Sequence, residues 1–572
     1  FLPAGRILAG AGTGRAVTLF NCFVMGTIPD NLDGIFEHLR EAALTMQQGG
    51  GVGMDFSTIR PAGAAVHGVG AKASGPLSFM DAWDAMCRTV MSAGQRRGAM
   101  MACLRIDHPD IEDFIDAKRD PARLRNFNVS ALVTDAFMAA LAADQDWPLQ
   151  FNGEVYRSVR ARDLWARLMR ATYDVAEPGV IFIDRVNAAN NLAYCETIAA
   201  TNPCGEQPLP PYGACLLGSI NLARLVQHPF TLEAHIDQAR VAELTSTSVR
   251  FLDNVIDVSR YPLREQEQEA KAKRRIGLGV TGLADALIFC GARYGAQDGL
   301  ALTRSWLDTI RGAAYRASAA LAREKGAFPA FDTALLNQPM LAALDAETRA
   351  LIAEHGLRNG CLTTIAPTGT ISLLAGNTSS GIEPVFAFLY QRRVRQPDNS
   401  YREEPVQDYA LTVWKRLHGE DIPPVHSFVS AQTLTPADHL AMQAAAQEFV
   451  DSSISKTINC PEDISFEDFA DVYVRAYDLG CKGCTTYRPN AVTGSILSVE
   501  QPASTPAAPP SPMPALTARP GPWRLPAWSR RCSGAGVMCL SWPKSSKPCL
   551  IPAAAPGWAG ATCPRCSRRL AM

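Results

Sequence analysis

The chain has 572 residues, of which 47% are hydrophobic and 19% charged, with a formal net charge of −1. This composition indicates a soluble globular protein with a large core, and the near-zero charge gives no general argument for binding nucleic acid or a membrane. There is no signal-peptide pattern and no apolar run near 18 residues, so we expect a cytoplasmic protein. Its sixteen cysteines are then not a disulfide scaffold.

Helices and short strands alternate from residue 1 to about 495. Apolar residues recur every three to four positions in three stretches that end near glycine, which predicts helices over 35–48, 77–94 and 301–326. Short β-branched, apolar runs predict buried strands at 127–133, 179–184 and 361–367. The alternation favours an α/β fold with a largely parallel sheet, which could be open or closed.

The amino-acid composition and the hydrophobic periodicity both change near residue 500. Residues 501–572 hold nine Lys and Arg but no acid, so residues 1–500 carry 56 acids against 46 bases. The same segment has fourteen prolines, four of the nine tryptophans and no periodicity, and it resembles translation in a shifted frame. We therefore expect a folded domain over 1–495 and a disordered tail over 496–572. The opening FLPAGRILAG has no initiator Met, and we expect an N-terminally incomplete chain.

The stretch ATNPCGEQPLPPYGACLLGSINL (200–222) holds the residues with the clearest chemistry. Cys204 lies in a Pro-Cys-Gly segment that is either extended or a tight turn. Asn202 and Glu206 lie two residues to either side, and share one side of the chain if the segment is strand-like. A thiol that forms a radical, a general base and an amide that binds a diol together fit a substrate with several hydroxyls.

Cys215 follows Cys204 by eleven residues and is expected to be half of a dithiol. The sequence alone does not choose its partner. The alternative is a metal site or a buried structural pair, but CxxC spacing is missing here and the nearby cysteines lack His companions, so we expect no metal.

These motifs together resemble ribonucleotide reductase catalytic chains. NPCGE and GACLLGSINL are followed by APTGTISL and SSGIEP, and the order of motifs agrees over about residues 1–495 through FLPAGRILAGAGT, GGGVGMDFSTIRPAG, ASGPLSFM, HPDIEDFIDAKRD and CKGCTTYRP. The resemblance implies a ten-stranded α/β barrel. It also implies reduction of ribonucleotides, with diphosphates the expected substrates, to 2′-deoxyribonucleotides for DNA synthesis.

The resemblance also implies roles. Cys204 would be the thiyl radical that removes the ribose 3′-hydrogen, Glu206 would take the 3′-hydroxyl proton, and Asn202 would hold the hydroxyls as water leaves C2′. Cys215 would pair with Cys22 as a redox-active disulfide that delivers two electrons.

A second group of residues would bind the nucleotide. The turn APTGTIS can aim backbone N–H groups at phosphate, although in isolation it could be an ordinary loop. By resemblance the substrate-binding residues are Gly5, Asn21, Cys22, Gly51, Asn202, Pro203, Cys204, Gly205, Glu206, Pro367, Thr368, Gly369, Thr370 and Ile371. Gly5 departs from the Ser or Thr often found there, so it could contribute only backbone.

GLGVTG (277–282) matches the dinucleotide-binding pattern GxGxxG. The preceding KAKRRI is a poor buried strand, and a lone match is weak, so we expect these glycines to serve close helix packing instead.

The radical source is expected to be adenosylcobalamin. Tyr487 stands alone where oxygen-dependent reductases carry a Tyr-Tyr pair, and we find no glycyl-radical motif or four-cysteine zinc site. The sequence of residues 21–57 most resembles the class II, adenosylcobalamin-dependent group. The alternatives are a class I catalytic subunit that needs a radical-generating partner, and a nucleotide-binding remnant that does not turn over.

Regulation and re-reduction are also implied by the resemblance. A deoxynucleotide effector would bind at the interface of a homodimer, contacting Asp30 and Arg60, while Arg96 and Arg97 would either relay base identity or be solvated surface charges. A thioredoxin- or glutaredoxin-like reductant would act through a C-terminal pair. The candidates are Cys563 with Cys566, which are accidental if the tail is out of frame, and Cys481 with Cys484.

Overall fold

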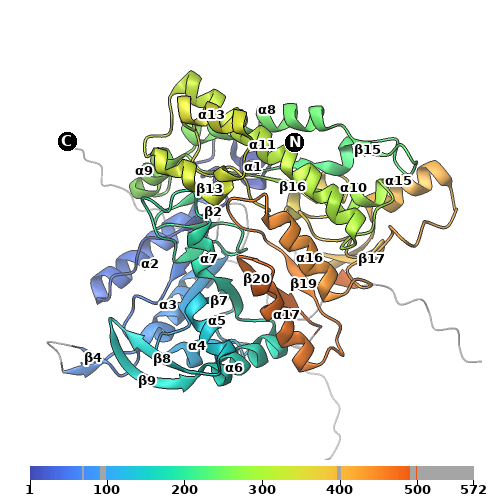
Figure 1. Cartoon of the computed structure of the whole chain (residues 1–572). Coiled ribbons are helices and arrows are strands. Elements are labelled where there is room, and N and C mark those ends of the chain that lie inside the picture. The colour runs from blue at the N-terminus through green and yellow to red at the C-terminus, as the bar shows by residue number, and fades with distance from the viewer. Residues whose placement is uncertain (67–69, 91–97, 396–400, 490–496, 499–572) are drawn as a thin grey trace, which may run out of the picture. The chain divides into compact units, whose positions relative to one another are not determined.

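The computed structural model describes residues 1–66, 70–90, 98–395, 401–489 and 497–498. One compact unit covers Phe1–Pro502, and a second, Ala503–Met572, lies wholly outside the described residues. The first unit is a mixed α/β body with helices packed around a central sheet (Figure 1).

The central sheet has ten strands. They are β1 (Leu2–Pro3), β2 (Cys22–Val24), β3 (Gly51–Asp55), β6 (Met100–Arg105), β7 (Phe127–Val133), β10 (Gly179–Phe182), β13 (Ala214–Asn221), β16 (Ile276–Thr281), β19 (Thr457–Asn459) and β20 (Gly483–Tyr487). Strands β2, β3, β6, β7 and β10 run parallel to one another, as do β13 with β16 and β19 with β20. The two groups meet antiparallel, where β13 pairs with β2 and where β10 pairs with β20.

The sheet closes on itself. Single parallel bridges join Leu278 of β16 to Thr363, and Ile365 to Ile454 just before β19. The segment 361–367, expected as a strand, therefore sits in the sheet but makes no regular ladder. The carboxylate of Asp451 accepts the N–H groups of Leu362 and Thr363, so a side chain replaces part of the missing strand partner. The predicted α/β barrel is confirmed.

The helices surround the barrel. They are α1 (Gly5–Gly10), α2 (Leu32–Gln47), α3 (Gly75–Thr89), α4 (Ile111–Asp116), α5 (Asp135–Ala142), α6 (Ala161–Val175), α7 (Ile183–Ala188), α8 (Gln238–Val258), α9 (Arg264–Lys273), α10 (Leu283–Phe289), α11 (Gln297–Lys325), α12 (Pro339–Ala342), α13 (Ala346–His355), α14 (Gly369–Leu374), α15 (Tyr409–His418), α16 (Pro436–Gln447) and α17 (Phe466–Asp478), with the 3₁₀ turns η1 (Leu222–Leu225) and η2 (Thr333–Asn337). The three helices expected from periodicity are α2, α3 and α11.

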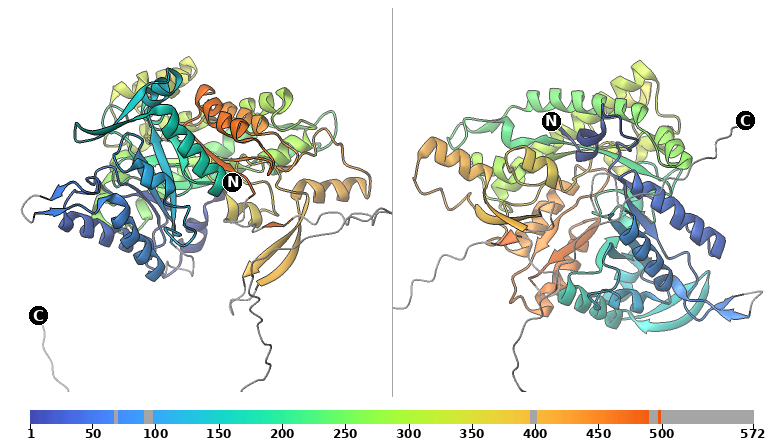
Figure 2. Two further views of the ribbon diagram at one scale, coloured as in Figure 1. Left: turned by 90° about the horizontal axis from the view of Figure 1, so that it is seen from below. Right: turned by 180° about the vertical axis from the view of Figure 1, so that it is seen from behind.

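The described residues also form smaller sheets of two or three strands outside the barrel sheet. They are β4 (Ala65–Val66) with β5 (Ala71–Lys72), β8 (Asp146–Phe151) with β9 (Glu154–Arg160), β11 (Ala200–Thr201) with β12 (Pro208–Leu209), β14 (Val226–Gln227) with β15 (His235–Ile236), and β17 (Leu389–Arg395) with β18 (Tyr401–Gln407) and β21 (Leu497–Ser498). Strands β17 and β18 extend away from the barrel (Figure 2).

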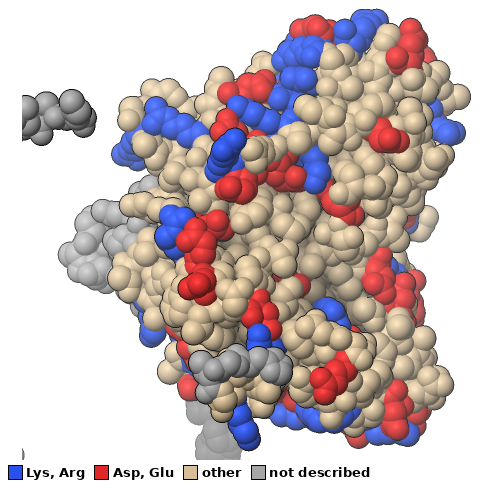
Figure 3. Space-filling model, turned by 90° about the vertical axis from the view of Figure 1, so that its left-hand side faces the viewer, with Lys and Arg blue, Asp and Glu red and all other residues tan. Residues whose placement is uncertain are grey.

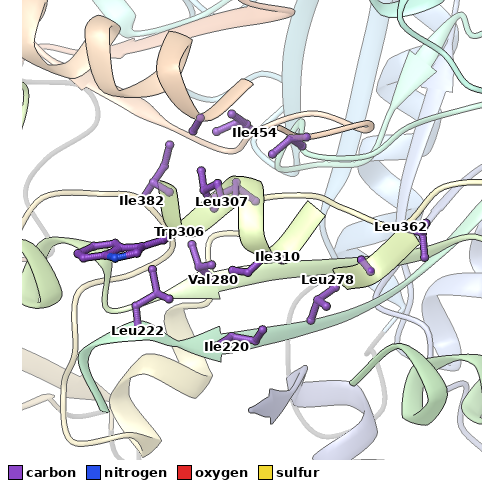
Figure 4. Close-up of a cluster of buried hydrophobic side chains, with 14 of the residues drawn as sticks. Ile220, Leu222, Leu278, Val280, Trp306, Leu307, Ile310, Leu362, Ile382 and Ile454 are labelled. Carbon is purple, nitrogen blue, oxygen red and sulfur yellow. The ribbon is translucent and has the colours of Figure 1, made fainter. Parts of the chain in front are cut away.

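Side-chain alternation along the strands separates the outer core from the barrel interior. In β6, Ala102 and Leu104 pack outward in one large cluster, while Met101 and Cys103 join a small cluster that also contains Cys215. The second large cluster packs β13 and β16 against α11, where Trp306, Leu307 and Ile310 meet strand residues such as Ile220 and Val280 (Figure 4). The small interior cluster around Cys215 also contains Val24, Leu132 and Leu217.

The GLGVTG segment is not a helix-packing motif, and this expectation was wrong. Residues Ile276–Thr281 form strand β16, fully buried between β13 and segment 361–366. A Cβ on Gly277 would lie 2.9 Å from Cys215 Sγ and 2.6 Å from Thr364 Cγ2, and one on Gly279 would lie 2.1 Å from the Thr364 carbonyl oxygen. The glycines allow close strand packing beside Cys215.

Two surface properties complete the description. In the part of the chain that the structure describes, no helix combines the length and apolar character needed to cross a bilayer. Lys and Arg are interspersed with Asp and Glu over the face shown in Figure 3, with no large area of one sign.

Candidate active site

A cavity of about 570 Å³ gathers most of the predicted site residues. Its lining includes Gly5, Asn21, Cys22, Gly51, Pro203, Cys204, Glu206, Pro367, Thr368, Gly369, Thr370 and Ile371. These residues come from four distant parts of the sequence, and the barrel brings them together. A cavity of this volume accommodates a ligand the size of a nucleotide.

The Cys204 segment is a closed turn, so the strand-like alternative is wrong. The Gly205 N–H donates to the Asn202 carbonyl at 3.1 Å, and the Asn202 N–H donates to the Gln207 carbonyl at 3.2 Å. Gly205 has φ +78, a conformation that favours glycine. The turn leaves Cys204 exposed in the cavity while Asn202 and Glu206 are buried beside it.

Among the described residues, two buried polar atoms of this turn make no hydrogen bond of normal geometry, Asn202 Nδ2 and Glu206 Oε2, although the amide lies near enough to lower the pKa of the carboxyl. Burial raises the pKa of Glu206 to about 7, and the neighbouring Asn202 amide opposes the rise. A carboxyl group with this pKa exchanges protons readily near neutral pH, as a general base must. The Glu206 backbone is fixed in turn, because its carbonyl accepts from Thr364 Oγ1 at 2.8 Å and from the Ser453 N–H at 3.0 Å.

Cys22 and Cys215 lie directly opposite each other on β2 and β13. Both are present as thiols. Directly opposed residues of antiparallel strands have Cα atoms roughly 4.5–5.5 Å apart, within the range that a disulfide spans. Burial, with the nearby Glu206 carboxyl as a lesser cause, raises the pKa of Cys215 well above its ordinary value. The pair can therefore form a disulfide without moving the strands.

The predicted phosphate loop precedes and begins α14. Thr368 has φ +52 and ψ 14, which is unusual for a residue with a side chain, and its hydroxyl makes no capping bond to the helix. The Thr370 side chain packs 3.9 Å from the Cβ position of Gly5. Gly5 therefore lies beside the phosphate loop, where a Cβ would make only an ordinary van der Waals contact with Thr370.

Several lining residues were missed by sequence reasoning. Two arginines, Arg6 and Arg392, are among the cavity-lining residues, and Gly49, Gly98 and Ala99 complete the wall near Gly51. Arg6 packs against Gly49, where a Cβ would lie 2.4 Å from its Nη1. The GGG run at 49–51 and the arginine next to Gly5 were the available signals.

Cys204 also borders a second cavity of about 290 Å³. Asn128, Gln443, Lys456, Thr457 and Lys482 are among its polar lining residues. Gln443 is 3% exposed, its Nε2 donates to the Gly483 carbonyl at 2.9 Å, and its Oε1 is buried with no hydrogen-bond partner within the described part of the chain. Pro203 and Cys204 thus line both cavities.

The residues predicted to bind an effector lie outside the two cavities or outside the described residues. Asp30 and Arg60 form an ion pair at 2.8 Å, whereas Arg96 and Arg97 lie outside the described residues. Cys563 and Cys566 also lie outside them. Cys481 and Cys484 are buried in the outer core, and burial raises the pKa of Cys481 to about 12. Such thiols are poorly suited to exchange with a reductant.

Comparison with known proteins agrees with this geometry. Residues 20–487 match the family model described as ribonucleotide reductase, barrel domain. A "Vitamin B12-dependent ribonucleoside-diphosphate reductase" of Mycobacterium tuberculosis is 39% identical over 525 residues, covering 88% of this chain and 70% of that protein. The protein of the same name from Thermoplasma acidophilum is 36% identical over 519 residues, covering 87% of this chain and 65% of that protein.

A relative with a different name is less similar. The "Ribonucleoside-diphosphate reductase subunit alpha" of Chlamydia muridarum is 27% identical over 566 residues, covering 85% of this chain and 53% of that protein. The family model covers most of the chain, including every barrel strand after β1. The chain therefore belongs to the ribonucleotide reductase family.

Proposed function

We propose that the chain reduces ribonucleoside diphosphates to 2′-deoxyribonucleotides by a thiyl-radical mechanism that depends on adenosylcobalamin. The observation that carries this proposal is the single cavity shared by Cys204, Glu206, Cys22 and the 367–371 loop. The two relatives named as vitamin B12-dependent share more of its sequence than the subunit-alpha relative does, which favours this class over one that needs a radical-generating partner.

Three residues of the turn act on the ribose. The Cys204 thiyl radical removes the hydrogen atom from C3′ and becomes a thiol. Glu206 takes the proton of the 3′-hydroxyl, for which a pKa of about 7 suits it. Asn202 Nδ2, buried and without a partner in the turn, donates to a ribose hydroxyl as water leaves C2′.

Cys22 and Cys215 supply the reducing equivalents. Two electrons and two protons pass from the two thiols to the substrate, whose C2′–O bond breaks and whose C2′–H bond forms. The products are a deoxyribonucleotide, one water molecule and the Cys22–Cys215 disulfide. The hydrogen atom then returns from Cys204 to C3′, which regenerates the thiyl radical.

The phosphate end of the nucleotide lies at the 367–371 loop. The first backbone N–H groups of α14 have no acceptor within the helix and can donate to phosphate oxygens. Arg392 lines the same cavity with its positive charge. Asn21 Oδ1 is buried without a partner and can accept a hydrogen bond from the nucleotide.

The second cavity fits the adenosyl group of adenosylcobalamin. It reaches the Cys204 thiol separately from the nucleotide cavity, and Gln443 Oε1 is a buried acceptor for an amine or hydroxyl. Gln443, Asn128 and Thr457 would hold the group. When bound, adenosylcobalamin supplies the radical chemistry that oxidises the Cys204 thiol by one electron.

Further partners follow from the same reaction. The disulfide must be reduced after each turnover, which calls for a thioredoxin- or glutaredoxin-like protein. A deoxynucleotide effector bound near Asp30 and Arg60 in a homodimer would select the substrate base. Each of these is part of the proposal.

The decisive test is anaerobic incubation of the chain with adenosylcobalamin, dithiothreitol and each ribonucleoside diphosphate. Deoxynucleotide should form with the wild type and be absent with Cys204→Ser, which should still bind the diphosphate. Product from the variant would contradict the role of Cys204. Activity that appears only after a separate radical-generating subunit is added would contradict the cofactor.

A further inference from the structure

Strand β16 ends in a hydroxyl that reaches the phosphate loop. Thr281 is fully buried, and its Oγ1 lies 3.0 Å from Thr368 Oγ1 and 3.0 Å from the Ser379 carbonyl oxygen. We propose that Thr281 is a positioning residue that holds Thr368, and with it the phosphate loop, in the conformation that binds the nucleotide. The inference rests on the proposed function, in which residues 367–371 bind the substrate phosphates.

The direction of these hydrogen bonds follows from their chemistry. A carbonyl only accepts, so the single hydrogen of the Thr281 hydroxyl is donated to Ser379. The Thr281 oxygen must then accept from the Thr368 hydroxyl, whose oxygen in turn accepts from the Gly381 N–H at 2.8 Å. A continuous chain therefore runs from Gly381 through Thr368 and Thr281 to Ser379, and each hydroxyl in it both donates and accepts.

Thr368 needs such support because its backbone is in the left-handed region. With φ +52 it adopts a conformation that residues other than glycine rarely take unless their surroundings hold them there. A threonine before a helix usually turns its hydroxyl toward the helix backbone. Here the hydroxyl makes no such bond and is directed to Thr281 instead, so it does not compete with a ligand for the N–H groups of the loop.

The other end of the chain is anchored to the barrel. The Ser379 carbonyl also accepts from the Gly282 N–H at 2.7 Å, and the Ser379 N–H donates to Asp285 Oδ2 at 2.8 Å. Asp285 is fully buried in α10, which begins directly after β16. Thr281 thus connects the loop to an element that has little freedom to move.

The same strand passes the redox pair at its other end, beside Cys215. Loss of the Thr281 hydroxyl should nevertheless act on the phosphate end alone, since Gly277 rather than Thr281 contacts Cys215. This separation makes the role of Thr281 measurable as binding that depends on phosphate.

The test compares the binding of a ribonucleoside diphosphate with that of the same ribonucleoside, by calorimetry on the full chain without cofactor. Thr281→Val keeps the shape but removes the hydroxyl. It should weaken diphosphate binding about fivefold to tenfold, as loss of one buried hydrogen bond does, and leave nucleoside binding unchanged. Thr281→Ser should restore the wild-type affinity for the diphosphate.

A matched control is Thr303→Val. Thr303 is also fully buried, and its hydroxyl donates to the Gly299 carbonyl at 2.8 Å within α11, away from the loop. This control should lower the unfolding temperature without changing either affinity. Should the valine variant at position 281 fail to fold, Thr281→Ala against Thr281→Ser gives the same comparison.

Each result has a clear reading. Equal diphosphate affinity in wild type and the folded Thr281→Val variant would overturn the inference. So would equal weakening of diphosphate and nucleoside, because the hydroxyl would then support the fold in general. A wild type that binds the diphosphate no better than the nucleoside would overturn the phosphate assignment of the proposed function, and the inference with it.

Discussion

The buried carboxyl of Glu206 should make the stability of the protein depend on pH. Glu206 is 1% exposed, and burial raises its pKa from 4.5 to about 7. In the unfolded chain the same group ionises near its ordinary value. As pH rises from about 4.5 to 7, the unfolded state loses this proton before the folded state does, so the carboxyl increasingly disfavours folding. Glu206→Gln removes the ionisation and keeps the shape of the side chain.

The magnitude follows from the pKa. A rise from 4.5 to about 7 corresponds to about 3 kcal/mol that the wild type loses by pH 8 and retains at pH 4.5 and below. For a folded unit of about 500 residues, unfolding entropy converts this free energy into about 3 °C in Tm. About a quarter of this is already lost at pH 5, so relative to wild type the variant should gain about 2 °C between pH 5 and pH 8.

Thermal unfolding measured anaerobically with dithiothreitol, and without nucleotide, gives this difference directly. A variant that is equally stabilised at both pH values would show that packing, rather than ionisation, sets the difference. A variant that loses stability relative to wild type between pH 5 and pH 8 would refute the reasoning, because ionisation of the carboxyl would then stabilise the folded state. The activity of the wild type should rise with pH through about 7, as Glu206 becomes able to accept a proton.

Two further changes test the site and its support. Gly277→Ala adds a methyl group against Cys215, so it should lower the free energy of unfolding by about 1–3 kcal/mol and also reduce the deoxynucleotide formed in a single turnover. The control Gly312→Ala, whose new methyl group would meet the flexible Arg316 side chain, should change neither quantity. Equal yields from the two variants would contradict the contact with Cys215. Asp253→Asn should cost about 3 kcal/mol in urea unfolding, because fully buried Asp253 pairs with Arg274 at 2.8 Å. Glu324→Gln, in an exposed surface pair, should cost far less than Asp253→Asn, and equal costs would refute the argument.

Hydrophobic periodicity in the sequence correctly predicted those helices and strands whose structure depends mainly on their own residues. The strand expected at 127–133 is β7 (Phe127–Val133), a short run rich in apolar and β-branched residues that is buried except at Asn128. Helix α11 ends at Gly326, whose φ of +86 a helix cannot continue through. In both cases the local residues determine the structure.

Prediction failed where a distant residue decides the structure. Two of the three glycines in GLGVTG, Gly277 and Gly279, lie within β16, although glycine weakens a strand on propensity. Their place in the strand is explained by distant neighbours, since Thr364 and Leu217 leave no room for a side chain at Gly277. In segment 361–367, two N–H groups, those of Leu362 and Thr363, donate to Asp451, some ninety positions later, rather than to a neighbouring strand. No local pattern carries this information.

The candidate site likewise combines residues that the sequence motifs identified with features that only the folded chain reveals. Motif resemblance identified Cys204, Glu206 and the 367–371 loop, all of which line the cavity. The register that sets Cys22 opposite Cys215 is a property of the folded sheet and could be implied only by the family. Arg392 reaches the cavity from a hairpin strand that carries no recognisable motif.

The position of the two thiols bears on the covalent topology of the enzyme. Strands β2 and β13 belong to the two oppositely directed groups of barrel strands, and Cys22 and Cys215 lie at the junction between them. In the proposed cycle each turnover therefore cross-links the two groups and closes residues 22–215 into a covalent ring, which reduction opens again. The oxidised chain is a ring with two tails, and the reduced chain is linear. The redox state of the enzyme can thus be followed by any method that distinguishes the two forms after denaturation, such as migration on a non-reducing gel.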